Sequence, residues 1–322
     1  MDGEELTAQQ TALYDRQIRV WGVDAQKRLS KANVLVSGLN GTVAEFCKNI
    51  VLAGVGSLTL MDDRLVTENA THANFLITAE ESKLSGRSLA EVYCNSLREF
   101  NPMVHVSVEK GDLHYFDGNF FDKFDIVIIS GYSLKVKKLI NSKCRERQKR
   151  IAFYTVECRG SCGEIFVDLQ NYTYAQKKSD GTIECHMEYP SLEDAISIPW
   201  RDLPKKTTKT YFAMRVLEYF ESSQYGKLCQ TSDFSLPHVL ESRKVLCDEQ
   251  GLSESHLPDA LLNRLVAAGA REYPPVCAIL GGFLGQEVIK AISGKGDPIK
   301  NFFYFDAADG KGIIEDISPP SK

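Results

Sequence analysis

The chain has 322 residues, of which 43% are hydrophobic and 25% charged, and its formal net charge is −5. This composition is ordinary for a globular protein, and it lacks the strong basic excess that nucleic-acid-binding proteins usually carry. Residues 1–10 are polar and acidic, without the apolar run of a signal peptide, and no segment has the roughly 18 uninterrupted apolar residues of a membrane span. We therefore expect an intracellular globular protein that binds neither nucleic acid nor membranes.

Strand and helix patterns alternate along the first half of the chain. A polar helix is expected over residues 7–22. The apolar run 33–37 is typical of a buried strand, and a glycine turn (38–41), a helical pattern (42–53) and a second strand (57–62) follow it, which makes one strand–helix–strand unit. The alternation continues with helices expected at 25–31, 88–100 and 133–150, and strands at 104–109, 124–129 and 151–156. This order predicts a Rossmann-like α/β fold, with a mainly parallel sheet and helices on both faces.

The alternation breaks near residue 170. Residues 173–209 are polar and rich in proline, and helices are expected after them at about 210–221, 236–247 and 258–268. We therefore predict a discontinuous domain, residues 1–170 and 270–322, interrupted by a largely helical insert over 171–269. A long apolar helix over 276–293 contains three glycines, which weaken a helix unless they allow close packing against a neighbour. A hairpin around Asp309 and Gly310 is expected to end the domain.

The glycine turn stands where a dinucleotide-binding fingerprint would stand. In such a turn, glycines let backbone N–H groups and the helix N-terminus approach a phosphate. Gly38 and Gly41 are present, but Asn40 replaces the second glycine of the fingerprint and Val43 the last. A Cβ at Asn40 narrows the phosphate space, so the turn is expected to be degenerate and to close the strand–helix unit. Asp62, at the end of the second strand, is placed either to bond a ribose hydroxyl or to remain a solvated carboxylate.

Several stretches resemble the ubiquitin-activating enzyme superfamily, the modifier-activating enzymes. In the N-terminal half they are residues 14–22 (YDRQIRVWG), 25–29 (AQKRL), 34–41 (VLVSGLNG) and 48–56 (KNIVLAGVG). In the C-terminal part they are residues 275–282 (PVCAILGG), 286–290 (QEVIK) and 301–306 (NFFYFD). The C-terminal stretches are similar in particular to the smaller, non-thioester subunits of SUMO-activating heterodimers. The resemblance covers most of residues 12–168 and 273–317 and is weaker between them.

The resemblance implies a division of labour between two adenylation-type subunits. The larger subunit would hold ATP and Mg²⁺, the C-terminal glycine of SUMO and the thioester cysteine, so this chain would hold no cofactor or metal itself. The smaller subunit would lend an arginine from its N-terminal helix, across the interface, to the ATP phosphates. Arg16 matches that arginine, and Arg19 is a weaker second candidate. A guanidinium suits this role because it is always charged and binds phosphate oxygens in a fork.

Two departures from the family pattern indicate that this chain is pseudo-catalytic. Active members have an Asn-Arg-Gln stretch after the second strand, but residues 71–76 here read THANFL, without an arginine. The family's magnesium aspartate lies just past the strand at 124–129, where residues 130–133 here read SGYS. We therefore expect no ATP turnover by this chain alone, and contact with SUMO only through the complex. The subunit interface is expected at the N-terminal helices and at the helix over 276–293.

The nine cysteines are expected to be reduced and without catalytic function. Cys158 has a cation beside it and Cys185 lies next to His186, so these two are the candidates for a thioester nucleophile, but buried or incidental thiols are the usual case. Cys158 and Cys162 form one close pair, whereas structural zinc usually needs two such pairs, so we expect no metal. The basic stretches 135–138 and 143–150 could form a nuclear targeting signal or a solvated helix face.

Three alternatives remain open at this stage. A dinucleotide-dependent oxidoreductase would share the fold but needs an intact glycine fingerprint. A non-enzymatic scaffold would bind the same partner without using Arg16. A small subunit for another ubiquitin-like modifier would have the same architecture, with a longer insert than the one here. The resemblance favours a location in the nucleus, with the cytoplasm as a second compartment.

Overall fold

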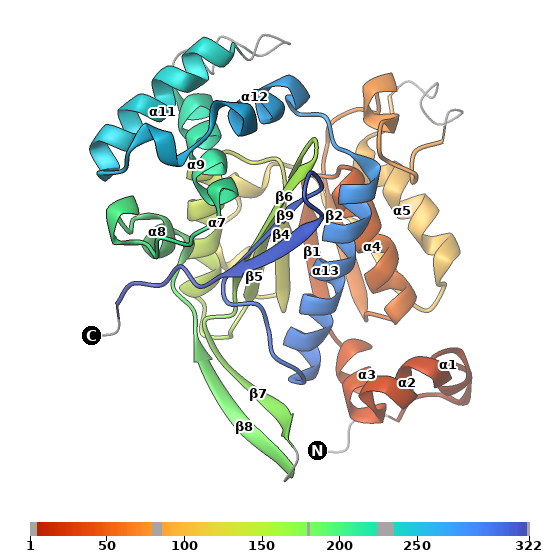
Figure 1. Ribbon diagram of the computed structural model, residues 1–322. Coiled ribbons are helices and arrows are strands. Elements are labelled where there is room, and N and C mark those ends of the chain that lie inside the picture. The colour runs from red at the N-terminus through yellow and green to blue at the C-terminus, as the bar shows by residue number, and fades with distance from the viewer. Residues whose placement is uncertain (1–4, 79–85, 179–180, 224–234, 321–322) are drawn as a thin grey trace.

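The computed structural model describes residues 5–78, 86–178, 181–223 and 235–320 (Figure 1). Its centre is an eight-stranded sheet with the order β10-β9-β6-β5-β4-β1-β2-β3. Five strands are parallel, namely β1 (Asn33–Ser37), β2 (Ser57–Met61), β3 (His105–Val108), β4 (Ile126–Ile129) and β5 (Ala152–Arg159). Antiparallel strands extend one edge, namely β6 (Cys162–Asp168), β9 (Phe302–Asp306) and β10 (Lys311–Glu315). The mainly parallel sheet and the closing hairpin are confirmed, whereas β6 was not predicted.

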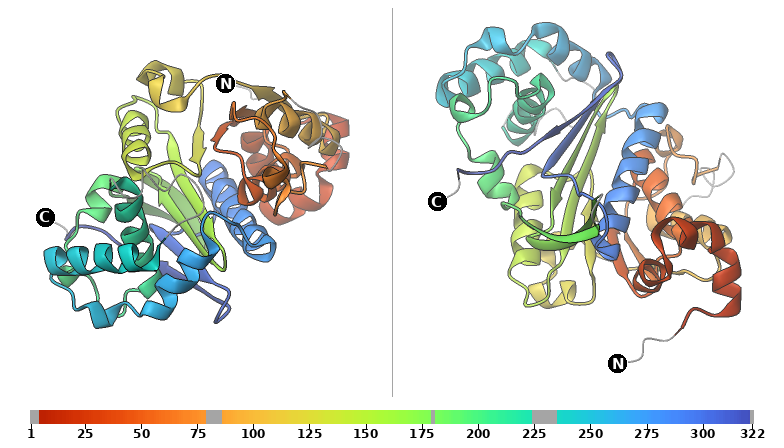
Figure 2. Two further views of the ribbon diagram at one scale, coloured as in Figure 1. Left: turned by 90° about the horizontal axis from the view of Figure 1, so that it is seen from above. Right: turned by 60° about the horizontal axis from the view of Figure 1, so that its bottom comes forward.

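Helices pack on both faces of the sheet, as predicted (Figure 2). In β1, Val34 and Val36 face the core under α4 (Gly41–Ala53), while Leu35 between them faces the opposite core. Successive side chains of a strand point to opposite faces, so a strand that is covered on both sides must be apolar throughout. The first face also carries α5 (Leu89–Phe100) and α13 (Pro274–Ser293), and the second carries α6 (Gly118–Phe121), α7 (Leu134–Arg145) and the helices of the insert. Short 3-10 helices span Glu68–Thr71, Leu113–Tyr115, Trp200–Asp202 and Glu254–His256.

The N-terminal segment forms three short helices, α1 (Ala8–Leu13), α2 (Asp15–Trp21) and α3 (Val23–Leu29). The single helix expected over 7–22 is divided at Tyr14. This side chain is 2% exposed, and its hydroxyl accepts a hydrogen bond of 2.8 Å from Asn101. Its ring lies so close to Gly54 that any Cβ there would collide with it. The burial of this one ring therefore anchors the segment on the C-terminal end of α4 and breaks the helix.

Helix α13 is long and apolar enough to cross a membrane by length and composition, but 56% of that stretch is buried within the protein. It packs along α4. A Cβ at Gly281 would lie 2.8 Å from the backbone nitrogen of Phe46, and one at Gly285 would lie 3.4 Å from the Cβ of Asn49. The expectation that glycines in this helix allow close packing is therefore confirmed for these two positions. Buried Glu287 accepts a hydrogen bond from the Ile299 backbone, as suits a core helix.

The insert begins with a β-hairpin that was not predicted, formed by β7 (Asn171–Lys178) and β8 (Gly181–Glu188), and it extends from the sheet in Figure 1. The predicted helices follow as α9 (Lys209–Ser222), α11 (Leu236–Gln250) and α12 (Asp259–Ala268), after the short α8 (Leu192–Ile196). Tyr211, Phe212 and Val216 of α9 are buried in the same core as Leu35 and Phe302 of the sheet. The helices of the insert thus complete the second face of the sheet.

Candidate functional site

The glycine turn between β1 and α4 is held tightly by its own chain. Gly38 has φ +82°, and a Cβ there would collide with the carbonyl oxygen of Ser130. A side chain is disfavoured on both counts, since only glycine adopts this backbone region freely. A Cβ at Gly41 would collide with the carbonyl oxygen of Ala73. The two glycines therefore serve contacts within the chain.

Asn40 caps α4 from inside the turn. Its Oδ1 accepts a hydrogen bond of 3.0 Å from the Val43 N–H, and its Nδ2 donates to the Ser130 hydroxyl at 2.8 Å. Asparagine is a preferred N-cap, and removal of such a cap costs about 1 kcal/mol. With Asn40 in place of a fingerprint glycine, the turn has less space for a phosphate. In return, it gains the cap on α4 and a hydrogen bond to Ser130 at the end of β4.

A carboxylate that follows the insert in the sequence, that of Glu272, occupies the N-terminus of α4. The Gly41 N–H donates to Glu272 Oε2 at 2.6 Å, and the Thr42 N–H and hydroxyl donate to Glu272 Oε1 at 3.1 and 2.7 Å. Burial raises the pKa of Glu272, and these donors counteract that rise. The helix N-terminus carries a partial positive charge that attracts anions, so Glu272 lies where a bound phosphate would lie in a nucleotide-binding Rossmann turn.

Asp62 also bonds within the chain. The residue is 7% exposed, and its carboxylate accepts a 2.7 Å hydrogen bond from the Leu39 N–H and forms an ion pair of 2.6 Å with Arg64. The neighbouring Asp63 accepts a bond from the Gly111 N–H at 2.7 Å. Asp62 is therefore not a solvated carboxylate, and its oxygens tie the end of β2 to the glycine turn. A ribose contact for Asp62 stays a prediction.

The end of β4, where the family's magnesium aspartate would lie, carries Ser130 and Gly131. The Gly131 N–H donates to Glu157 at 3.1 Å, and Glu157 pairs with Lys137 of α7 at 2.8 Å. Lys137 is 3% exposed and also contacts Glu218 of α9 at 3.2 Å. Burial alone would lower the pKa of Lys137, but the two carboxylates raise it. A buried ion-pair network thus fills the region beneath the strand end.

The network continues under the antiparallel strands. Arg215 of α9 binds Glu164 of β6 at 2.7 Å, and the Tyr304 hydroxyl donates to the same carboxylate at 2.7 Å. At the far edge, Arg264 of α12 pairs with Asp306 of β9 at 2.5 Å. These groups join the insert to the sheet, and their charges are satisfied by one another, so they have a structural role.

A cavity of about 870 Å³ lies beside the glycine turn, with Asn40, Arg64, Asn74 and Glu272 among its lining residues. It has the place of a nucleotide pocket in this fold, but its polar groups do not suit a nucleotide. Glu272 holds the helix N-terminus, Asn40 narrows the turn, and residues 130–133 supply no carboxylate for magnesium. The residues present therefore do not fit ATP and Mg²⁺, so no catalytic step is assigned to this pocket.

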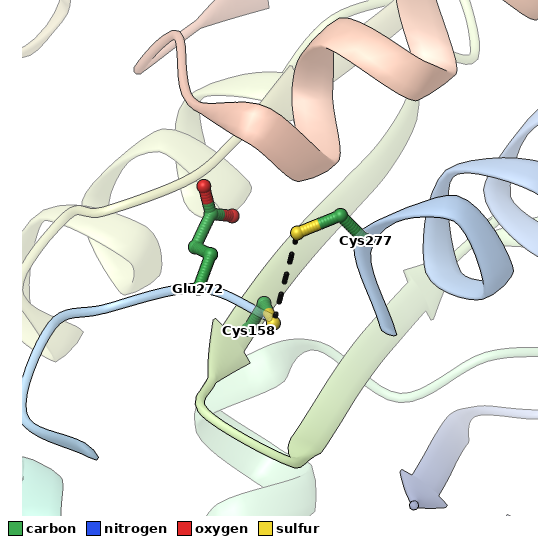
Figure 3. A group of neighbouring side chains, drawn as sticks. All are labelled: Cys158, Glu272 and Cys277. Atoms are coloured by element: carbon green, nitrogen blue, oxygen red, sulfur yellow. Dashed lines mark hydrogen bonds between the residues drawn. The ribbon is translucent and has the colours of Figure 1, made fainter. Parts of the chain in front are cut away.

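The two candidate thiols, Cys158 and Cys185, lie in different surroundings in the structure. Among the described residues, Cys158, Glu272 and Cys277 form a group that could hold a metal ion, since their ligand atoms lie within 4.8 Å of one another (Figure 3). Both sulfurs are buried, 4.0 Å apart, and the Glu272 oxygens already accept three hydrogen bonds. Cys185 is half-buried and its sulfur lies 3.7 Å from the Gln176 side chain. Fully buried thiols such as those of Cys158 and Cys277 are usually inert.

Burial raises the thiol pKa of several cysteines. The affected thiols are those of Cys47, Cys94, Cys144, Cys162 and Cys247, of which Cys162 reaches about 12. For Cys277, the hydrogen bond with Cys158 and burial together raise the pKa. A raised pKa keeps a thiol protonated, and only the thiolate is a good nucleophile. Cys229 lies outside the described residues.

Arg16 lies on α2, far from this chain's own glycine turn. Gln17, the next residue, donates to the Leu52 carbonyl near the C-terminal end of α4, whereas the glycine turn lies at its N-terminal end. The 13 residues of α4 span roughly 20 Å. The Arg16 side chain is exposed and forms no ion pair or hydrogen bond with a residue among 5–78, 86–178, 181–223 and 235–320. Arg19 instead pairs with Asp15 at 2.8 Å.

The N-terminal helices also expose apolar side chains. Val20 is 82% exposed, Leu13 55% and Val23 46%. Apolar side chains gathered on a surface mark an interaction site more often than isolated ones do. The structure thus places Arg16 on a segment that is suited to meet another protein.

The basic stretches do not form a free targeting signal in the folded chain. Lys137 belongs to the buried network described above. Arg145 pairs with Asp168 at 2.8 Å, and Arg147 and Lys149 pair with aspartates at the same distance. A solvated helix face, with its charges largely paired, describes this surface better.

The mainly parallel sheet and the glycine turn at the start of α4 define a Rossmann-like α/β protein, and comparison with known proteins gives its family. Residues 14–321 match the ThiF family, and the chain belongs to that family. Within it, the chain is a member of the group of SUMO-activating enzyme subunit 1 proteins. It is 62% identical over 318 residues to SUMO-activating enzyme subunit 1B-1 of Arabidopsis thaliana, with 99% of each chain covered.

More distant relatives also carry the name SUMO-activating enzyme subunit 1. The chain is 32% identical to SUMO-activating enzyme subunit 1 of Homo sapiens over 347 residues, with 98% of each chain covered, and 32% identical to that of Xenopus laevis over 341 residues, with 96% of each covered. A crystal structure of selenomethionine PaaA matches with a TM-score of 0.63 over 98% of this chain and 86% of that one. Its sequence is only 14% identical, so it supports the fold alone.

Glu272, Arg64 and Glu157 were not found by sequence reasoning. Glu272 is 231 residues from Gly41 along the chain, and no local pattern marks a residue whose partner is so distant. The sequence did show that residues 130–133 contain no carboxylate. It could not show that the Gly131 N–H there donates to Glu157, because that contact depends on how β4 and β5 pair.

Proposed function

We propose that this chain is the pseudo-catalytic, non-thioester subunit of a SUMO-activating enzyme. Its family membership implies that the complex uses ATP and that a larger subunit is its partner. The larger subunit would hold ATP and Mg²⁺, the C-terminal glycine of SUMO and the thioester cysteine. This chain would supply an interface, and SUMO would reach it only through the complex.

The observation that carries the proposal is the separation of Arg16 from the chain's own turn. An arginine that is exposed, without a described partner and at the opposite end of α4 from Gly41 cannot serve this chain's own pocket. It is available to a neighbouring subunit, where its fork could bind the phosphate oxygens of ATP. Preorganised positive charge there would stabilise the charge that develops as the SUMO carboxylate attacks the α-phosphate.

Reconstitution tests the proposal. The purified chain is mixed with the large SUMO-activating subunit at micromolar concentration, and size-exclusion chromatography reports the complex. Formation of SUMO adenylate and thioester is then measured for each subunit alone and for the mixture. We expect a heterodimer, with activity only in the mixture. A chain that stays monomeric, or that makes acyl-adenylate by itself, would refute the assignment.

The purified chain also allows tests of two other functions, an oxidoreductase and a small subunit for another modifier. An oxidoreductase would bind NAD tightly as a purified chain, which the filled helix N-terminus argues against. A small subunit for another modifier would pair with a different large subunit in a pulldown from cell extract. We propose the nucleus as the location of the complex, and fluorescence of a tagged chain tests it.

A further inference from the structure

We propose that Glu272 is a built-in anion that occupies the phosphate position of this fold and blocks that position in the chain's own nucleotide pocket. This inference goes beyond the proposed function, because it concerns the pocket that the complex does not use for catalysis. It also holds whether or not Arg16 acts on a partner's ATP.

The first step of the argument is the supply of hydrogen-bond donors at the start of α4. A phosphate at a Rossmann turn is held by the N–H groups of the turn and of the first helical residues. Here Gly41 and Thr42 donate to Glu272, and Val43 donates to Asn40. Leu39 donates to Asp62. Four N–H groups of this region thus have acceptors within the chain, and a phosphate would have to displace them.

The second step is that the carboxylate is fixed in place. The backbone before Glu272 is tied to the end of β5, because the Gly160 N–H donates to the Arg271 carbonyl at 2.8 Å. Helix α13 begins at Pro274, two residues after Glu272. The side chain is thus held between a strand end and a long core helix.

The third step concerns Gly41. A Cβ at this position would lie 2.9 Å from Glu272 Oε2 and would collide with the Ala73 carbonyl oxygen. The glycine that would admit a phosphate in a nucleotide-binding relative therefore admits a carboxylate here. The cavity beside it, about 870 Å³, stays open, so the closure acts at the phosphate position and leaves the rest of the pocket in place.

Glu272→Ala should convert the helix N-terminus into an anion site. The full-length variant is titrated with inorganic pyrophosphate by calorimetry, and its melting temperature is measured with and without the anion. Because a helix N-terminus favours an anion, we expect pyrophosphate to bind the variant about tenfold more tightly than the wild type, which corresponds to about 1.4 kcal/mol. Without the anion, the variant should melt at a lower temperature, since its N–H groups lose their acceptor. Pyrophosphate should restore part of that loss.

Glu249→Ala is the matched control, because it removes an equally negative but exposed side chain on α11. Its melting temperature and its weak pyrophosphate binding should equal those of the wild type. Equal pyrophosphate affinity of Glu272→Ala and the wild type would overturn the proposal, as would a melting temperature that pyrophosphate does not raise selectively in the variant.

A second variant covers a failure of Glu272→Ala to fold. Glu272→Gln keeps the shape and removes the charge, so it should fold and gain a smaller, still selective stabilisation by pyrophosphate. A crystal of either variant soaked in sulfate should then hold the ion at the N–H groups of Gly41 and Thr42. A folded Gln variant that responds to anions as the wild type does would refute the role of Glu272.

Discussion

Replacement of Arg16 by alanine should lower ATP–pyrophosphate exchange by the reconstituted heterodimer about 10- to 100-fold. Hydrogen bonds that involve charged groups contribute about 1.5–3 kcal/mol, and each 1.36 kcal/mol changes a rate tenfold. Because Arg16 is exposed and contacts no described partner in its own chain, the free energy of unfolding should change by less than about 0.5 kcal/mol. Loss of activity without loss of stability is the signature expected of an arginine used by a neighbour.

Arg19→Ala is the matched control on the same helix. Arg19 is also exposed but is paired with Asp15, an interaction worth about 0.3–0.5 kcal/mol for residues four apart on a helix. Its exchange rate should stay near that of the wild type. Arg16→Lys should keep part of the activity, since lysine retains the charge but not the fork. Full assembly together with wild-type exchange in Arg16→Ala would refute the reasoning and favour a scaffold.

Three further changes test how the chain itself is held together. Gly38→Ala should lower the free energy of unfolding, measured in urea, by about 2–4 kcal/mol, because the alanine would have a strained backbone and its Cβ would collide with Ser130. Gly282→Ala is the control, because a Cβ at that position meets nothing within 4 Å. It should be neutral or stabilise α13 by up to about 1 kcal/mol. Lys137→Met should cost about 3–5 kcal/mol, because Glu157 loses its cation while Glu218 keeps only Arg215 as a described partner. Lys138→Met, at the half-exposed neighbouring lysine, should cost less than about 1 kcal/mol. Equal effects of the two substitutions would contradict the role of the buried ion-pair network. Burial would raise the pKa of Asp306, but hydrogen bonds from its arginine partner hold it below its usual value. Its charge therefore stabilises the fold above about pH 4, and the stability difference between wild type and Asp306→Asn, followed by thermal melting, should shrink as the pH falls below that value.

The order of elements could be predicted because it depends on local pattern. Each signal that predicted an element spans only a few residues. The apolar run at residues 33–37 forms β1, the glycines after it form the turn before α4, and Asp309-Gly310 forms the turn of the closing hairpin. The hairpin of β7 and β8 was missed because β8 is mostly polar and exposed, and because the buried alternation of β7 is limited to Tyr172 and Tyr174.

The site was only partly predictable, for a different reason. The degeneracy at Asn40 and the missing carboxylate at residues 130–133 are visible as substitutions in a known pattern. What replaces the lost ligand is not visible, because Glu272 lies 231 residues from Gly41 along the chain. Likewise, the division between α1 and α2 depends on the burial of Tyr14 against residues that are distant in the sequence. These contacts depend on tertiary packing, which a single sequence does not encode locally.

The distance along α4 has a consequence for how the enzyme would be controlled. If Arg16 and the glycine turn lie at opposite ends of α4, one copy of this chain cannot form a complete active site with its own arginine. Catalysis is then lost on dilution, because the two subunits dissociate, and the rate of SUMO conjugation in the cell follows the concentration of the scarcer subunit. A cell could set its conjugation rate by the supply of a polypeptide that never touches the reacting carbonyl.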